Sequence, residues 1–135
     1  MFFTDLCTVN KTTTRTATIF FDKNDILHIE MFDGIRVDYE DMIDNALVIK
    51  RLTSETRFLK LIDARANFSI DKKAREFINA LDAKQTIAQA VLKGSAFRRV
   101  LFCIFISLHK SKTPVKIFSD YDEAYNWLMS YKRPK

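Results

Sequence analysis

The sequence contains very little glycine: its 135 residues include two, Gly34 and Gly94. Loops that cradle phosphates, such as GxxxxGK[ST] and GxGxxG, need closely spaced glycines so that the backbone can approach the ligand. Because these two glycines lie far apart, the chain has neither a P-loop nor a dinucleotide-binding fingerprint. We therefore exclude enzymes that depend on those two motifs, and we expect no cofactor.

Cysteine is equally scarce, since Cys7 and Cys103 are the two in the chain. They lie in no CxxC or metal-binding spacing, so we expect two reduced thiols rather than a disulfide or a redox pair. Cys103 is expected to pack in the core. Neither His28 nor His109 has sequence neighbours typical of a metal site or a catalytic pair, and we predict no metal site.

Long apolar runs are also missing from the chain. No segment approaches the roughly 20 apolar residues that are needed to cross a bilayer. The beginning of the sequence has no basic leader and carries Asp5 where a signal peptide needs an uninterrupted apolar core. The sequence therefore predicts a cytoplasmic protein without a transmembrane segment.

The composition is that of a soluble globular protein of one domain, with 47% hydrophobic and 29% charged residues. The net charge of +5 permits binding to anionic lipid, nucleic acid or an acidic protein and specifies none of them. Nucleic-acid binding needs a basic stripe interleaved with exposed aromatic residues. Here the basic residues are mixed with acids and the aromatic residues fall on apolar faces, so we predict no nucleic-acid partner.

The beginning of the chain predicts an arm followed by a hairpin. Residues 1–14 are rich in threonine and indicate a loosely ordered arm or a poor edge strand, whereas residues 15–135 form the domain. β-Branched and aromatic residues at 15–21 and 26–32 flank the turn Asp22-Lys23-Asn24-Asp25. This arrangement is typical of a β-hairpin.

The rest of the chain alternates between helical and strand patterns. A helix begins at Asp38, a capping residue, and runs to about residue 52. Residues 86–92 suit a strand, although their composition also tolerates a continued helix. The elements expected after the first helix are a strand at 58–63, a helix from 69–71, a strand at 86–92, a helix at 95–109, a strand at 114–118 and a helix from Asp120.

The expected order is therefore ββαβαβαβα in one α/β domain. Alternating strands and helices imply a mostly parallel sheet with helices packed on it, and the opening hairpin adds an antiparallel edge. No internal repeat and no low-complexity linker divides the chain.

Three stretches of sequence carry a family resemblance: Leu61-Ile62-Asp63-Ala64-Arg65, then Lys93-Gly94-Ser95 before an apolar helix, then Ile117-Phe118-Ser119-Asp120 followed by Glu123-Ala124 and Trp127-Leu128. Over about residues 15–132 the chain resembles the STAS and SpoIIAA-like group, and more narrowly the small uncharacterised bacterial proteins described as STAS/CRAL-TRIO-like. The resemblance implies a regulatory or ligand-binding module, since STAS domains act as anti-anti-sigma factors or transporter appendages and CRAL-TRIO relatives carry lipids.

The anti-anti-sigma branch of that group has an Asp-Ser-Ser/Thr-Gly turn whose serine is phosphorylated. The corresponding region here, residues 67–73, has no Ser or Thr after Asp71 and no glycine. The resemblance therefore does not bring the phosphorylation switch to this chain. Ser69 would take that role only if the loop changed its register.

Two strand ends are candidate ligand sites. In open parallel sheets, ligands favour the crevice at the carboxyl ends of the strands, where helix N-termini present free N–H groups. Cations at both ends suit a phosphate or carboxylate head group; the alternative is that these side chains cap helices, pair with each other or lie in solvent. The candidate residues are Asp63, Arg65, Ser69 and Lys72 at one end and Gly94, Ser95, Arg98 and Arg99 at the other.

The stretch from Val100 to Leu108 has no polar residue except Ser107, so a helix here is apolar on every side. Such a helix is either buried in the fold or covered by a second copy of the chain, a partner or a lipid. The candidate interaction surface consists of Leu101, Phe102, Phe105 and Leu108.

Two functional hypotheses follow from the sequence. The first is a non-enzymatic cytoplasmic regulatory or protein-interaction module that forms a homodimer through the helix at Val100 to Leu108. The second is a binder of a small anionic amphiphile or lipid between the sheet and the 95–109 helix, with Ser95, Arg98 and Arg99 at the head group. Helix capping explains the clustered acids near Asp38 and Asp120, so we assign no catalytic residue and expect no enzyme.

Overall fold

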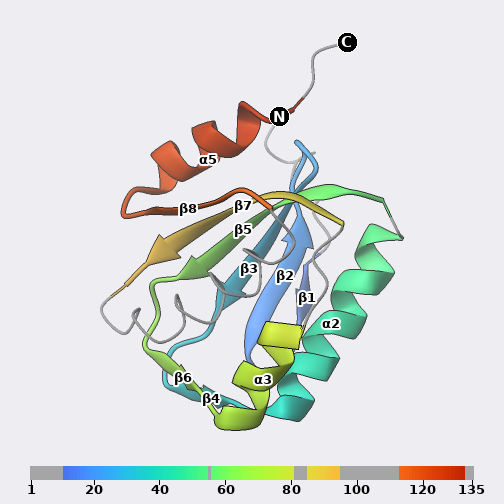
Figure 1. The fold of residues 1–135 in the computed structure, drawn as a ribbon, viewed down its shortest axis with the longest axis vertical. Helices are drawn as coiled ribbons and strands as arrows, with labels where there is room; N and C mark the ends of the chain where they lie inside the picture. Colours follow the sequence, from blue (N-terminus) through green and yellow to red (C-terminus); the bar gives the residue numbers. More distant parts are fainter. Residues whose placement is uncertain (1–10, 55, 81–84, 95–112, 133–135) are drawn as a thin grey trace.

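The computed structural model describes residues 11–54, 56–80, 85–94 and 113–132 (Figure 1). The larger of two sheets has the strand order β1-β2-β3-β5-β7-β8. The described strands are β1 (Thr12–Thr13), β2 (Ala17–Phe21), β3 (Ile26–Met31), β4 (Ile35–Val37), β5 (Phe58–Ala64), β6 (Phe68–Ile70), β7 (Thr86–Lys93) and β8 (Val115–Phe118), and the helices are α2 (Tyr39–Thr53), α3 (Lys72–Ala80) and α5 (Tyr121–Met129).

β2 and β3 form the predicted antiparallel hairpin. Asp22 closes its turn, because Oδ1 accepts hydrogen bonds from the backbone N–H groups of Asn24 at 2.8 Å and Ile26 at 3.1 Å. Asp25 has a φ of 63°, the left-handed conformation that aspartate adopts more readily than most residues. The turn residues therefore determine where the hairpin reverses.

β3, β5, β7 and β8 are parallel to one another, which confirms the predicted mixed, mostly parallel sheet. The central strands are apolar because both of their faces are covered. In β5, Leu59 and Leu61 belong to the core on the α5 side, whereas Ile62 and Ala64 belong to the core on the other side. Residues 86–93 form a strand, since pairing with β5 and β8 outweighs their tolerance for a helix.

α5 packs on one face of the sheet, over β5, β7 and β8 (Figure 1). Ala124 and Leu128 are completely buried there, and burying a leucine side chain fully contributes about 2 kcal/mol. Asp120 caps the helix as predicted, because its side chain accepts a hydrogen bond from the backbone N–H of Glu123 at 2.9 Å. No helix among the described residues has the length and apolarity needed to cross a membrane.

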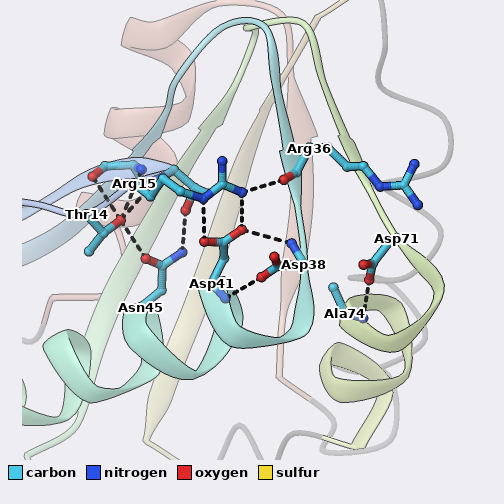
Figure 2. Close-up of polar contacts among 10 residues, drawn as sticks. Thr14, Arg15, Arg36, Asp38, Asp41, Asn45, Asp71 and Ala74 are labelled. Atoms are coloured by element: carbon cyan, nitrogen blue, oxygen red, sulfur yellow. Dashed lines mark hydrogen bonds and ion pairs between the residues drawn. The ribbon is translucent and has the colours of Figure 1, made fainter.

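α2 begins with a capping box in which one carboxylate also pairs with an arginine side chain (Figure 2). The side chain of Asp38 accepts from the backbone N–H of Asp41 at 2.8 Å, and the Asp41 carboxylate accepts from the N–H of Asp38 at 2.9 Å. The same carboxylate, which is buried, accepts from Nε and Nη2 of Arg15. Hydrogen bonds from Arg15 lower the pKa of Asp41 further than burial raises it.

A second set of contacts joins α2 to the start of β2. The side-chain amide of Asn45 donates to the hydroxyl of Thr16 at 3.0 Å, and its carbonyl accepts from the hydroxyl of Thr14 at 2.7 Å (Figure 2). Arg15 completes the connection by donating to the carbonyl of Arg36 at 2.7 Å. These contacts place α2 on the sheet face opposite α5, where Val48 packs in the core.

Two short strands, β4 and β6, were not predicted from the sequence. They pair in parallel as a second, two-stranded sheet. Ser69 lies in β6, so the prediction of a helix beginning as early as this residue is wrong; α3 begins at Lys72, and Asp71 accepts from the N–H of Ala74 at 2.9 Å. Three residues are too few for a strand pattern to be recognised against the start of a helix.

Two predicted segments fall wholly or partly outside the described residues. The helix at 95–109 lies outside them entirely, as do residues 1–10 of the N-terminal arm. Within the described part of that arm, Thr12 and Thr13 pair with β2 as the edge strand β1. The hydroxyl of Thr14 accepts from the backbone N–H of Ala17 at 3.2 Å, which joins the end of the arm to the first long strand.

Candidate functional site

A polar network centred on Asp22 joins the hairpin to α5. Oδ2 of Asp22 lies 2.8 Å from Nε2 of His28 and accepts from the hydroxyl of Tyr125 at 2.7 Å. That hydroxyl in turn accepts from the side-chain amide of Asn24 at 2.7 Å. The network therefore connects the turn between β2 and β3 with a helix 103 residues further along the chain.

These contacts determine the charge of the network. Burial would raise the pKa of Asp22, but hydrogen bonds from His28, Tyr125 and two backbone N–H groups outweigh it and lower the pKa to about 2. Burial and the carboxylate of Asp22 raise the pKa of Tyr125 to about 12, although the hydrogen bond from Asn24 opposes this shift. At neutral pH, Asp22 is therefore an anion and the hydroxyl of Tyr125 a donor to it.

His28 is enclosed by aromatic rings. Phe20 stacks on it with a centroid distance of 4.6 Å and an interplanar angle of 6°, and Tyr121 stacks at 6.4 Å. The histidine is 3% exposed, and within the described part of the chain its Nδ1 has no hydrogen-bond partner. A substrate in solvent has no direct access to this imidazole, so the contact between His28 and Asp22 stabilises the fold rather than presenting a reactive group.

Tyr121 is the exposed part of the same cluster. It is the first residue of α5 and is 37% exposed, while its ring stacks on Tyr125 with a centroid distance of 5.9 Å. Burial raises the pKa of Tyr121, and the negative charges of four nearby carboxylates raise it further: Asp22, Glu30, Asp122 and Asp63. The phenol of Tyr121 thus stays neutral beside several carboxylates.

Asp63 and Arg65, two of the predicted site residues, form an ion pair at the carboxyl end of β5. Nε and Nη2 of Arg65 donate to the two carboxylate oxygens at 2.9 and 2.7 Å. Burial would raise the pKa of Asp63, but these hydrogen bonds outweigh it and lower the pKa. The side chain of Arg65 is 50% exposed and that of Asp63 is 18% exposed, so the guanidinium faces solvent.

The ends of β5 and β7 meet directly beside this pair. A Cβ at Gly94 would lie 2.4 Å from the carbonyl oxygen of Arg65, so the absence of a side chain allows the two backbones to approach. The structure therefore brings together Asp63, Arg65 and Gly94, which come from the two strand ends that the sequence suggested. Ligand binding by these residues stays a prediction.

Two further predicted site residues, Ser69 and Lys72, are not part of this group. Ser69 and Lys72 are exposed on β6 and α3, and in the described part of the chain no hydrogen bond or ion pair links them to Arg65 or Asp63. The others lie outside the described residues: Ser95, Arg98 and Arg99 of the ligand site, and Leu101, Phe102, Phe105 and Leu108 of the interaction surface.

Sequence reasoning missed the acidic partner of His28. Asp22 and His28 are six positions apart. The hairpin register places His28 opposite Phe20, and the side chains of Asp22 and His28 meet on the α5 face. The turn sequence could have indicated this pairing, but the position of Tyr125 depends on packing between distant elements. Among the described residues, no group of three or more His, Cys, Asp or Glu side chains is arranged to hold a metal ion.

Comparisons with known proteins identify relatives of this architecture. The model of a family described as Domain of unknown function (DUF7793) matches residues 19–132. A solved structure of an uncharacterised DUF3478-family protein from Shewanella loihica, with a SpoIIAA-like fold, has a TM-score of 0.60 and 13% sequence identity; the match covers 89% of this chain and 91% of that chain. No curated protein matches the sequence. At this identity the structural match establishes the fold, and it confirms the SpoIIAA-like architecture that the resemblance implied.

Proposed function

The chain belongs to the DUF7793 family of domains of unknown function, and from this premise we propose that it is a non-enzymatic module that binds a protein partner. The observation that carries the proposal is the pair of exposed side chains Tyr121 and Arg65 above a buried network. Tyrosine and arginine are enriched at the energetic centres of protein interfaces. The proposal includes the regulatory role and the cytoplasmic location predicted from the sequence.

Both side chains are held in place before a partner arrives. The guanidinium of Arg65 is fixed by two hydrogen bonds to Asp63, and the ring of Tyr121 stacks on His28 and Tyr125. Ordering a long or aromatic side chain on binding costs about 0.5–1.5 kcal/mol, and a side chain that is already ordered avoids much of this cost. This surface is therefore suited to recognition.

The charges around Tyr121 indicate the chemistry of the partner. Four carboxylates act on its hydroxyl, and Arg65 is a cation nearby, although the whole chain has a net charge of +5. Electrostatic complementarity favours a basic segment at such a surface and disfavours an acidic one. We infer that the partner presents lysine or arginine side chains to this face.

The same network supports a non-enzymatic role. Asp22 and His28 are the described pair most similar to a catalytic acid and base, yet His28 is 3% exposed. A general base must come within hydrogen-bonding distance of the proton that it removes. Asp22 is already engaged by His28, Tyr125 and its own turn, so the pair has a structural explanation.

Affinity purification from the source organism, followed by mass spectrometry, tests the proposal. Wild-type protein is expected to retain a stoichiometric protein, and the double variant with Tyr121→Ala and Arg65→Ala is expected to lose it. Leu47→Ala is the matched control, because Leu47 is 58% exposed on α2, away from this face. Equal retention by all three proteins, or no stoichiometric protein on the wild type, would contradict the proposal.

The second candidate function is binding of a small anionic amphiphile. The contact between Gly94 and the backbone of Arg65 favours it, because this contact brings the two predicted strand ends together. A native mass spectrum of the purified protein separates the two candidates. An adduct of amphiphile mass on a monomer favours the second, whereas a dimer without an adduct favours the interaction module.

A further inference from the structure

Two polar side chains interrupt the apolar sheet face opposite α5. Lys60 on β5 and Gln89 on β7 are register partners in parallel strands, so their side chains are neighbours on the same face. The register partner of Lys60 on β3 and the register partner of Gln89 on β8 are both apolar. The next row of residues towards the carboxyl ends of the strands is apolar as well. These apolar neighbours are Leu27 and Val115 in the same row, followed by Ile29, Ile62, Val91 and Ile117.

Neither polar group is satisfied by the described part of the chain. Gln89 is 1% exposed, and its Nε2 has no hydrogen-bond partner there. Lys60 is half-buried, and burial lowers its pKa to about 8 with no carboxylate opposing the shift. Buried polar groups in proteins are almost always paired, so two adjacent unpaired donors need an explanation.

The sequence around these strands does not provide a counter-charge. No Asp or Glu occurs between Asp82 and Asp120, a stretch that includes β7, β8 and the whole connection between them. The same stretch contains seven lysine and arginine residues: Lys84, Lys93, Arg98, Arg99, Lys110, Lys112 and Lys116. No carboxylate from the stretch between Asp82 and Asp120 can therefore pair with the two donors.

We propose that Lys60 and Gln89 bind the carboxylate of a small organic acid with an apolar body. A carboxylate has two oxygens, one for the ammonium group of Lys60 and one for the amide N–H of Gln89. The apolar rows beside the pair provide contacts for the remainder of such a molecule. A multiply charged phosphate does not suit a site that has a single cation and apolar neighbours.

This site is independent of the proposed protein-binding face. Lys60 and Gln89 face away from α5, whereas Tyr121 and the cluster beneath it lie on the α5 side. Loss of one activity is therefore not expected to remove the other. If Lys60 and Gln89 bind no carboxylate, the proposed protein-binding face is unaffected. If that face binds no protein, the proposed carboxylate site is unaffected.

A titration with hexanoate, followed by NMR, tests the site in the full-length chain. The side-chain amide signal of Gln89 is expected to move and to saturate. Hexanol, which has the same apolar body without the charge, is expected to leave it unchanged. Lys60→Met and Gln89→Leu are each expected to weaken hexanoate binding about tenfold or more, as measured by calorimetry.

Lys93→Met is the matched control, because Lys93 is exposed at the end of β7 and its loss removes the same charge from the same strand. The control is expected to bind hexanoate as the wild type does. Three results would each overturn the proposal: no saturable shift of the Gln89 amide, equal binding by Lys60→Met, or equal binding of hexanol. Melting curves of each variant confirm that it is folded before binding is measured.

Discussion

Nε2 of His28 lies 2.8 Å from Oδ2 of Asp22, across a turn that separates the two residues by six positions. The other carboxylate oxygen accepts from backbone N–H groups of that turn. The side chain of Asp22 therefore stabilises both the turn and the contact with His28. Oδ1 closes the hairpin, and Oδ2 binds it to α5 through Tyr125. Removing the charge of Asp22 should therefore weaken both the hairpin turn and its contact with α5.

Asp22→Asn is expected to destabilise the protein in a pH-dependent way. The pKa of Asp22 is about 2 in the folded chain, below its ordinary value of 3.8, so its contribution is present above about pH 4 and is lost as pH falls through about 2. After discounting for solvent exposure, we expect a loss of roughly 1 kcal/mol at neutral pH and a smaller loss near pH 2. Urea unfolding at several pH values measures both.

The control for this variant is Asp25→Asn in the same turn. Asp25 is exposed and has a φ of 63°, which asparagine also adopts readily. The Asp25→Asn variant is expected to have the same midpoint urea concentration as the wild type throughout the pH range. If Asp22→Asn shows a constant loss from neutral to acidic pH, the assigned role of the carboxylate charge is wrong.

The hairpin and the capped helices could be predicted from the sequence because their signals are local. The turn from Asp22 to Asp25, the caps Asp38 and Asp120, and the apolar run at 58–63 each depend on neighbouring residues. The cluster around His28 depends on how β3 and α5 meet in space. No local pattern contains that information.

The candidate site residues also divide into those with a local sequence signal and those that depend on contacts between strands. Asp63, Arg65 and Gly94 were recognised as strand ends, and parallel pairing of β5 and β7 places such ends side by side. Lys60 and Gln89 were missed, because a lysine in an apolar strand is visible in the sequence but its cross-strand neighbour is not. Strands β4 and β6 were missed because they are three residues long.

Gly94→Ala is expected to destabilise the protein more than Gly34→Ala. At Gly94 the added methyl group meets the backbone of Arg65 at 2.4 Å, so β5 and β7 must separate. At Gly34 nothing lies within 4 Å, and the cost is backbone strain at a φ of 73°. Thermal unfolding should show about 1 kcal/mol lost at Gly34 and clearly more at Gly94. The reverse order would contradict the close approach of the two strands.

Lys60→Met is expected to make the protein more stable at neutral pH. Burial lowers the pKa of Lys60 to about 8 from 10.5, so folding penalises the charged amine. Because the unfolded chain then binds more protons, wild-type stability rises as pH increases from about 8 to about 10.5. Replacing the amine with an apolar side chain of similar length should add roughly 2 kcal/mol at neutral pH and progressively less as pH rises through this range.

Denaturant unfolding of wild type and Lys60→Met from about pH 7 to about pH 11 measures this effect. Lys116→Met, at an exposed position of β8, removes the same charge without the burial and should change stability little. A less stable Lys60→Met variant at neutral pH would show that the amine has a stabilising partner. A gain in stability together with a loss of hexanoate binding would indicate that a functional side chain is retained at a cost in stability.

Asp41→Asn is expected to weaken the attachment of α2 to β2. The carboxylate is 5% exposed and accepts from Arg15 and from the backbone N–H of Asp38, and an amide cannot replace all these contacts. Hydrogen exchange should therefore become faster in the first turn of α2, and the melting temperature should fall. Asp44→Asn, on the exposed face of the same helix, is the matched control. Unchanged exchange in Asp41→Asn would show that the network is dispensable.

Phe105→Asp tests the self-association that the sequence predicts for residues 100–108. If this apolar segment is covered by a second copy of the chain, one buried carboxylate should be enough to separate the copies, because an unpaired charge in an interface is costly. Light scattering coupled to size-exclusion chromatography should then show a wild-type dimer and a more soluble Phe105→Asp monomer. Leu47→Asp places the same charge on an exposed residue of α2 and should leave the dimer intact. A wild-type monomer, or a dimer that survives Phe105→Asp, would remove self-association through this segment and leave the face at Tyr121 and Arg65 as the proposed interaction surface.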